Sequence, residues 1–248
     1  MSYIQFLPMQ DNQQNLEIVA DNEKFNDWMY SEIKPFIKGD ILEVGSGLGT
    51  FSRRIIQDFL DKAEKIMLSD IDPRYLKNLE STFQNQKVKV RKIDLAKAED
   101  FTQLIETGQK FETIICLNVL EHVKDDVLAL DNLHKVLRPN GQIILLVPAH
   151  KFLFNSLDEA VLHFRRYTKE ELFSKVGQTK LQISNIFHFN IIAILGWFIN
   201  GTIFKKRVLS VPAFSFFNKL VPFFRFVERK ILFRFTGLSI IAILKNRA

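Results

Sequence analysis

The residues whose types and spacing best suit chemistry lie in one short segment, residues 41–51, which read ILEVGSGLGTF. An apolar run there leads into glycines at 45, 47 and 49, and a helix-like run follows. We therefore predict a strand, a tight turn and a helix N-terminus. Glycine allows positive φ angles and lets a ligand lie directly on the main chain. Because the first turn of a helix also leaves its N–H groups free, the segment predicts a cradle for a nucleotide-type cofactor.

The spacing of these glycines argues against two common nucleotide cradles. A dinucleotide fingerprint reads G-x-G-x-x-G, but position 50 is Thr, and no Lys follows as a P-loop requires. Glu43, just before the turn, suits a cationic ligand such as an ammonium or a sulfonium better than a diphosphate. The combination resembles motif I of the class I S-adenosylmethionine (SAM)-dependent methyltransferases. The resemblance assigns to the cofactor site Glu43, Gly45, Ser46, Gly47 and Gly49.

A second predicted strand, residues 66–70, ends in Asp70. A carboxylate at such a strand end can accept both ribose hydroxyls, so we assign Asp70, with Ile71 beside it, to the cofactor ribose. Asp72 is better placed to cap the helix that Pro73 opens.

Two further segments fall in the order that the family requires. Residues 88–95 resemble its third strand, which implies that Asp94 accepts from the adenine amine and that the Leu95 N–H meets a ring nitrogen. A solvated loop aspartate is the alternative. Residues 113–122 resemble its fourth strand and exit loop, where the methyl group emerges, and this places Asn118 and Val119 at the cofactor edge.

Alternating strand-like and helix-like segments up to residue 148 favour a parallel sheet with helices on both faces. The resemblance implies an α/β, Rossmann-like sheet of seven strands, mostly parallel, with the last strand antiparallel and a helical insertion between strands six and seven. We expect a helix over about 11–36, a turn at 137–141, and final strands at 181–188 and 237–245. Within one domain, 1–248, this gives an N-terminal helical segment (1–38), a SAM-binding core (39–148), an acceptor-binding segment (149–180) and an insertion (189–236).

The single cysteine, Cys116, permits no internal disulfide and indicates a reducing compartment. It lies in an apolar run, which favours a buried core thiol over a nucleophile. No basic-then-apolar leader opens the sequence. We therefore expect a cytoplasmic protein.

Positive charge and phenylalanine are concentrated toward the C-terminal end. Residues 180–248 carry a net charge of +10, with Glu228 as their one acid, and residues 1–179 carry −4. The same region holds 12 of the 24 phenylalanines. For the insertion this favours a surface that rests on an anionic membrane at the inner face. An ordinary helical cap, a membrane-spanning helix and a nucleic-acid surface remain alternatives, although phenylalanines in apolar blocks argue against base stacking.

Three histidines are candidates for a catalytic base. Methyl transfer is an in-line displacement at a sulfonium carbon, in which the enzyme aligns the acceptor and, for a hydroxyl, supplies a base. Histidine suits that role near neutral pH. His122 follows the predicted fourth strand, His150 follows the fifth, and His163 opens the segment HFRRYT. We rank them in that order, with a cofactor-pocket or capping role as the alternative for His122.

The segment after the fifth strand carries candidate acceptor ligands, namely Asp158, Arg165, Arg166 and Tyr167. Two adjacent arginines can hold a phosphate or carboxylate through paired N–H bonds. The alternative is a pair of surface arginines beside a helix start, because Thr168 and Glu171 fit a capping box.

The sequence favours neither a metal nor a nucleic-acid substrate. Quinone O-methyltransferases show a related Glu-x-x-Glu-His after strand four, which can hold a metal. Here Asn118 takes the first position and leaves Glu121 and His122, two adjacent ligands that make a poor site. We therefore expect no metal.

Amino-adenine methylation usually needs an Asn/Asp-Pro-Pro-aromatic loop after the fourth strand. Residues 118–120 read NVL, which argues against that activity.

Beyond these motifs, segments such as 25–30, 117–126, 163–168 and 196–201 resemble a bacterial subgroup of methyltransferases of type 11/12. The subgroup's substrates are mostly unassigned, and some members look associated with lipid-linked sugar transferases. We expect methyl transfer from SAM to an oxygen, or less favourably a nitrogen or carbon, of an apolar or lipid-linked acceptor. A soluble small-molecule methyltransferase with the insertion as a lid, and a SAM-binding module without turnover, are the alternatives.

Overall fold

A computed structural model describes residues 7–231 and 234–247 of the chain. The described residues exclude three small parts of the predicted segments: residues 1–6 of the N-terminal segment, residues 232–233 of the insertion, and residue 248 at the end of the domain.

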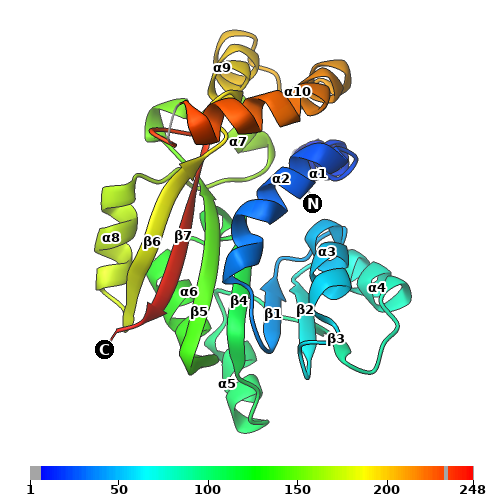
Figure 1. Cartoon of the computed structure of the whole chain (residues 1–248), viewed down its shortest axis with the longest axis vertical. Coiled ribbons are helices and arrows are strands. Elements are labelled where there is room, and N and C mark those ends of the chain that lie inside the picture. Colours follow the sequence, from blue (N-terminus) through cyan, green and yellow to red (C-terminus); the bar gives the residue numbers. More distant parts are fainter. Residues whose placement is uncertain (1–6, 232–233, 248) are drawn as a thin grey trace.

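The core is a sheet of seven strands in the order β3-β2-β1-β4-β5-β7-β6 (Figure 1). The first five strands pair in parallel, and β7 runs antiparallel to both β5 and β6. This confirms the predicted mostly parallel sheet with an antiparallel last strand. The strands are β1 (Ile41–Val44), β2 (Ile66–Asp70), β3 (Val88–Lys92), β4 (Phe111–Leu117), β5 (Leu137–Pro148), β6 (Leu181–Phe189) and β7 (Ser239–Asn246).

Strand order reverses between β1 and β4, which lie side by side with Val44 paired to Cys116. The loops that leave these two strands therefore emerge next to each other at the carboxyl edge of the sheet. In open parallel sheets this crevice is where ligands bind. The glycine turn and Asn118 meet at that point.

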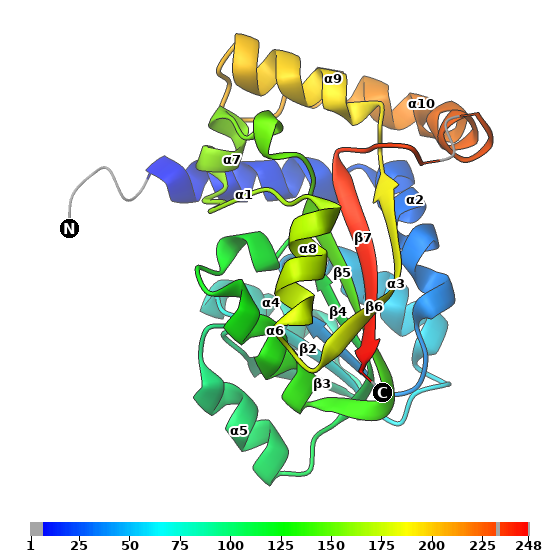
Figure 2. The same cartoon turned by 90° about the vertical axis from the view of Figure 1, so that its left-hand side faces the viewer.

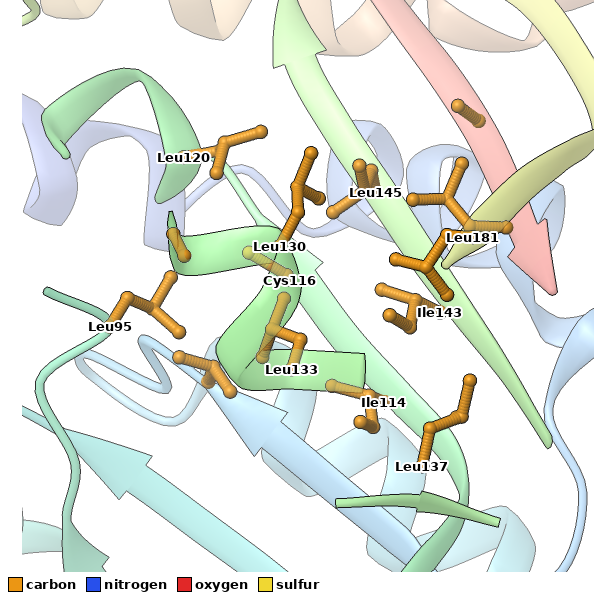
Figure 3. Close-up of a cluster of buried hydrophobic side chains, with 14 of the residues drawn as sticks. Leu95, Ile114, Cys116, Leu120, Leu130, Leu133, Leu137, Ile143, Leu145 and Leu181 are labelled. Carbon is orange, nitrogen blue, oxygen red and sulfur yellow. The ribbon is translucent and has the colours of Figure 1, made fainter. Parts of the chain in front are cut away.

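Helices cover both faces of the sheet. One face packs against α2 (Glu23–Ile33), the short η2 (Lys34–Phe36), α3 (Thr50–Phe59) and α4 (Pro73–Thr82), and the other against α5 (Ala98–Glu106), α6 (Asp126–Lys135) and α8 (Lys169–Gly177). Strands covered on both faces are buried along their length, as for all of β1 and residues 141–148 of β5. Figure 3 shows Cys116 among leucines and isoleucines of the second face. Burial raises the pKa of this thiol, as expected for a core residue.

The structure changes two local predictions, a helix and a turn, and confirms the predicted helix caps. The helix expected over 11–36 is split into α1 (Leu7–Ala20), α2 and η2. The turn expected at 137–141 lies within β5, where Phe111 pairs with Leu137 but Thr113 pairs with Gln142, so residues 138–141 loop out of the ladder. The predicted caps are confirmed: the Asp72 carboxylate accepts from the Arg74 N–H, and Thr168 and Glu171 form a capping box.

The insertion lies across the carboxyl edge of the sheet, together with α1 and α7 (Ser156–Ala160) (Figure 2). It consists of α9 (Ala193–Trp197), its π-helical continuation η5 (Phe198–Ile203), and the long α10 (Val211–Lys230). Glu228, 1% exposed, accepts hydrogen bonds from the N–H groups of Asn190 and Ile191, both at 2.8 Å. The one acid of the basic region thus fixes the end of α10 to the point where β6 leaves the sheet. Within residues 7–231 and 234–247, no helix is both long and apolar enough to cross a membrane.

Candidate active site

The three glycines of the turn after β1 have different structural reasons to be glycine. All have positive φ, at +71°, +52° and +78° for Gly45, Gly47 and Gly49. A Cβ on Gly45 would overlap Cγ2 of Val119, and one on Gly49 would lie 2.9 Å from the Phe83 ring. A Cβ on Gly47 would have no heavy atom within 4 Å. Packing therefore demands the outer two glycines, whereas the middle one borders open space that a ligand can enter.

Glu43 stabilises this turn through hydrogen bonds to its side chain. Its Oε2 accepts a hydrogen bond from the Ser46 hydroxyl at 3.0 Å and another from the Ser52 hydroxyl. Burial raises the pKa of Glu43 to about 7, against the lowering effect of these two hydroxyls. The sequence indicated that Glu43 suits a cationic ligand, and the structure shows a buried carboxylate whose partners are Ser46 of the turn and Ser52 of α3.

Asp70, at the end of β2, connects this strand to the glycine turn through a hydrogen bond. Its Oδ2 accepts from the Gly47 N–H at 2.8 Å and its Oδ1 from the Asp72 N–H at 2.9 Å. Burial raises the pKa of Asp70 above its ordinary value. A carboxylate has about four lone-pair sites, so Asp70 keeps acceptor capacity for hydroxyl groups at this strand end. Ile71 follows Asp70, and 55% of this apolar residue is exposed at the rim of the crevice.

The next two strand ends also carry the predicted residues. Asp94 follows β3, half-buried, with its Oδ1 accepting from the Ala96 N–H at 3.0 Å, and Leu95 is buried beside it. Asn118 follows β4 with φ +52° and donates its N–H to the Leu146 carbonyl at 2.8 Å. Such conformations in a non-glycine residue cluster at functional sites.

A cavity of about 320 Å³ lies against Asn118, between the carboxyl edge of the sheet and the helices above it. Most of its surface is apolar. Its lining comes from the strand ends and the segment after β5 (Asn118, His122, Pro148, Leu157, Val161, His163, Arg166, Leu238, Ser239), from α1 and α2 (Asn12, Asn15, Leu16, Val19, Phe25, Met29) and from the insertion (Asn190, Ile192, Ala193, Gly196, Trp197, Asn200, Leu209, Ser210, Ala213, Phe214, Phe217).

Residues 42–143 match the model of a family described as "Methyltransferase domain". Residues 42–143 therefore carry a methyltransferase domain. Among curated proteins the chain resembles the probable polyketide synthase 10 of Dictyostelium discoideum, with 32% identity over 143 residues, which is 49% of this chain and 6% of that protein. The chain thus spans only a small part of that relative's length.

Solved structures with similar folds span nearly the whole chain. A chain of a Haloferax volcanii complex between a methyltransferase activator and a methyltransferase covers 96% of this chain and 98% of its own, with a TM-score of 0.62 and 12% identity. The SAM-dependent methyltransferase of Mesorhizobium loti covers 88% and 98%, with a TM-score of 0.58 and 11% identity. At these identities the likeness concerns the fold.

The residues at the crevice fit SAM, the methyl donor that the sequence predicts for this domain. Gly47 leaves the main chain open to an approaching ligand, and Asp70 offers carboxylate oxygens at the strand end next to it. Asn118 connects the crevice to the cavity because it lies at the end of β4 and also lines the cavity. The individual cofactor contacts of these residues remain predictions.

The three candidate histidines separate into two places in the methyltransferase. His122 and His163 line the cavity, with their ring centres 4.7 Å apart. Burial lowers the pKa of His122 to about 4, so its ring is neutral at pH 7. His150 lies at the junction with β7, where its Nε2 is 2.7 Å from the Thr236 hydroxyl and its ring stacks on His188. The cavity wall therefore brings together the first and third candidates, and His150 is not among its lining residues.

The four predicted acceptor ligands have their partners within the chain, in two ion pairs and a hydrogen bond. Asp158 and Arg166 are both buried, and the Arg166 Nε lies 2.9 Å from each Asp158 oxygen. Arg165 pairs with Asp126 at 2.7 Å, and the buried Tyr167 hydroxyl donates to the same carboxylate at 3.0 Å. Of the four, Arg166 lines the cavity. These contacts engage the polar groups of Asp158, Arg165 and Tyr167 within the domain, and their role in acceptor binding stays a prediction.

The sequence did not identify several residues around the cavity whose contacts join distant segments of the chain. The Trp197 ring lies 4.7 Å from the Arg166 guanidinium carbon, a cation–π contact between the insertion and the wall below. Asn15 of α1 accepts from the Leu209 N–H at 2.8 Å and donates to the Arg207 carbonyl at 2.9 Å. No local pattern indicates these contacts, because they join segments far apart in the sequence.

Proposed function

We propose that this methyltransferase transfers the methyl group of SAM to an oxygen, or less favourably a nitrogen or carbon, of an apolar or lipid-linked acceptor held in the cavity. The observation that carries the proposal is the apolar cavity next to Asn118, the strand end where the methyl group is expected. SAM supplies the methyl group as part of a sulfonium. The chain holds the acceptor in line with it and excludes water, which is the main contribution an enzyme makes to such a displacement.

The roof of the cavity supports an acceptor with a long apolar part. Trp197, Phe214 and Phe217 of the insertion line the cavity, and Leu16 and Phe25 line it from α1 and α2. Apolar contact removes hydrocarbon from water at about 25 cal/mol per Å², so a chain-like or ring-like hydrocarbon fits better than a strongly polar acceptor. The carbon acceptor stays in the proposal because the relative named above is called a polyketide synthase.

The outer face of α10 supports a location on an anionic membrane surface. Phe216, Lys219, Phe223, Phe226 and Lys230 follow one another at helical spacing along its exposed side. Aromatic and basic residues on one face of a surface helix bind the interface of anionic bilayers, each cation adding about 1 kcal/mol near the surface. We propose a cytoplasmic protein bound peripherally to the inner membrane face, where a lipid-linked acceptor would be found.

One experiment distinguishes the acceptor classes. Methyl-labelled SAM is incubated with the full chain and separately with a lipid extract or an aqueous metabolite extract. Label in the organic phase supports the proposal, and label only in the aqueous phase favours a soluble small-molecule methyltransferase with the insertion as a lid. SAM binding with no label in either phase favours a binding module without turnover.

Vesicle flotation tests the membrane surface directly. Replacement of Phe216, Phe223 and Phe226 by serine should reduce binding to vesicles that contain anionic lipid. Phe173→Ser is the matched control, because this exposed phenylalanine belongs to α8, which lies along β6 (Figure 1). Equal flotation of the triple variant and the wild type would contradict a role for α10 in membrane binding.

A further inference from the structure

Glu121 is a buried carboxyl group close to the end of β4. It lies in the short helix η3 (Leu120–His122) after β4 and is 0% exposed. Neither of its carboxylate oxygens has a hydrogen-bond partner among the described residues. A buried charged group without a partner is strongly unfavourable. A ligand that binds both oxygens would remove this cost.

Two histidine rings lie beside this carboxylate. The Glu121 Oε1 is 3.6 Å from the His163 Nε2, and one ligand atom from each of Glu121, His122 and His163 lies within 4.8 Å of the other two. The backbone holds the two segments in register, because the Phe164 N–H donates to the Glu121 carbonyl at 2.9 Å.

The far side of each ring is anchored by an acceptor. The His163 Nδ1 lies 2.8 Å from the Asp158 Oδ1, and His122 hydrogen-bonds to the carbonyl of Leu162, which has φ +62°. An oxygen acceptor requires the proton on the nitrogen that faces it, so each neutral ring keeps one nitrogen lone pair free. Metal-binding histidines characteristically donate their other N–H to a carboxylate or a backbone carbonyl in this way.

We propose that Glu121, His122 and His163 bind a divalent transition-metal ion of the zinc class. Two imidazoles and one carboxylate are a ligand set of zinc sites that keep an open coordination position. Both histidines line the cavity, so the open position would face the acceptor. The use of the ion to hold an acceptor oxygen rests on the proposed function, whereas the site itself does not.

The proposal departs from the expectation of no metal, which was drawn from the sequence alone. That expectation considered only the adjacent pair Glu121 and His122, which cannot enclose an ion. The fold supplies the third ligand from the loop after α7. The sequence had singled out His163 as a possible base, and it did not indicate that this loop returns to η3.

Metal binding can be measured without any acceptor. The tag-free full chain is stripped with a chelator and titrated with Co²⁺, observed by visible absorption, and with Zn²⁺ by calorimetry. One ion per chain should bind, and Glu121→Gln and His163→Asn should each weaken binding at least tenfold. His134→Asn is the matched control, because His134 lies on α6. Circular dichroism checks that each variant is folded.

Absence of stoichiometric binding to the wild type, or unchanged affinity in both folded variants, would overturn the site. The first result would mean that a proton shared between Glu121 and His163 balances the buried charge. Metal binding without methyl transfer to any extract would leave the site standing and refute the proposed function alone.

Discussion

Gly45→Ala should destabilise the fold for two separable reasons. Alanine at φ +71° costs about 1–2 kcal/mol as a left-handed conformation. Its Cβ would also overlap Cγ2 of Val119, and overpacking of this kind costs typically about 1–3 kcal/mol. The sum is roughly 2–5 kcal/mol of lost unfolding free energy.

A double-mutant cycle isolates the packing part. Val119→Ala removes the overlapping methyl group, so the double variant should be less destabilised than the sum of the two single variants. We expect a coupling of about 1–2 kcal/mol in that direction. Gly47→Ala is the matched control: φ is +52° but no heavy atom lies within 4 Å of its Cβ, so only the backbone cost applies.

Urea unfolding followed by circular dichroism measures all four stabilities on one scale. Additivity within about 0.5 kcal/mol would refute the overlap between position 45 and Val119. So would a Gly45→Ala cost no larger than that of Gly47→Ala.

Two other predictions concern buried charge. The Glu43 pKa of about 7 lies above its ordinary value of 4.5, so the stability that the protonated group contributes is fully present below pH 4.5 and is lost as the pH rises through 7, by up to roughly 3 kcal/mol. In urea unfolding measured across this pH range, Glu43→Gln should reduce the pH dependence of the unfolding free energy. An equal pH dependence in the wild type and the variant would contradict the assignment. Asp158→Ala leaves the Arg166 guanidinium buried without its partner and should cost about 3–5 kcal/mol. Arg74→Ala, which removes an exposed ion pair, should cost less than about 1 kcal/mol, and similar costs for the two would show that the buried pair is not important for stability.

The elements that hold the cofactor could be predicted because their signals are local. The glycine turn, Asp70 at a strand end and the Asp72 cap each depend on residues close in sequence, and their places in the sheet follow from strand order. The antiparallel last strand was predictable through resemblance, since periodicity alone does not specify strand direction.

The acceptor side could not be predicted to the same depth because its contacts join distant segments. The pairing of Arg166 with Asp158 and its stacking against Trp197 depend on how the insertion settles on the loop after β5. The approach of His163 to Glu121 likewise depends on the path of that loop. Spacing within a motif carries no information on such contacts.

Calorimetric titration of SAM into the wild type, Gly47→Ala and Asp70→Ala tests the central claim most directly. The account predicts one site per chain in the wild type and at least tenfold weaker binding in each variant, with Gly47→Ala still folded. The first variant fills the open side of the turn, and the second removes the carboxylate at the end of β2. Absence of SAM binding to the wild type, or equal affinity in all three proteins, would contradict the assignment of this crevice to the cofactor.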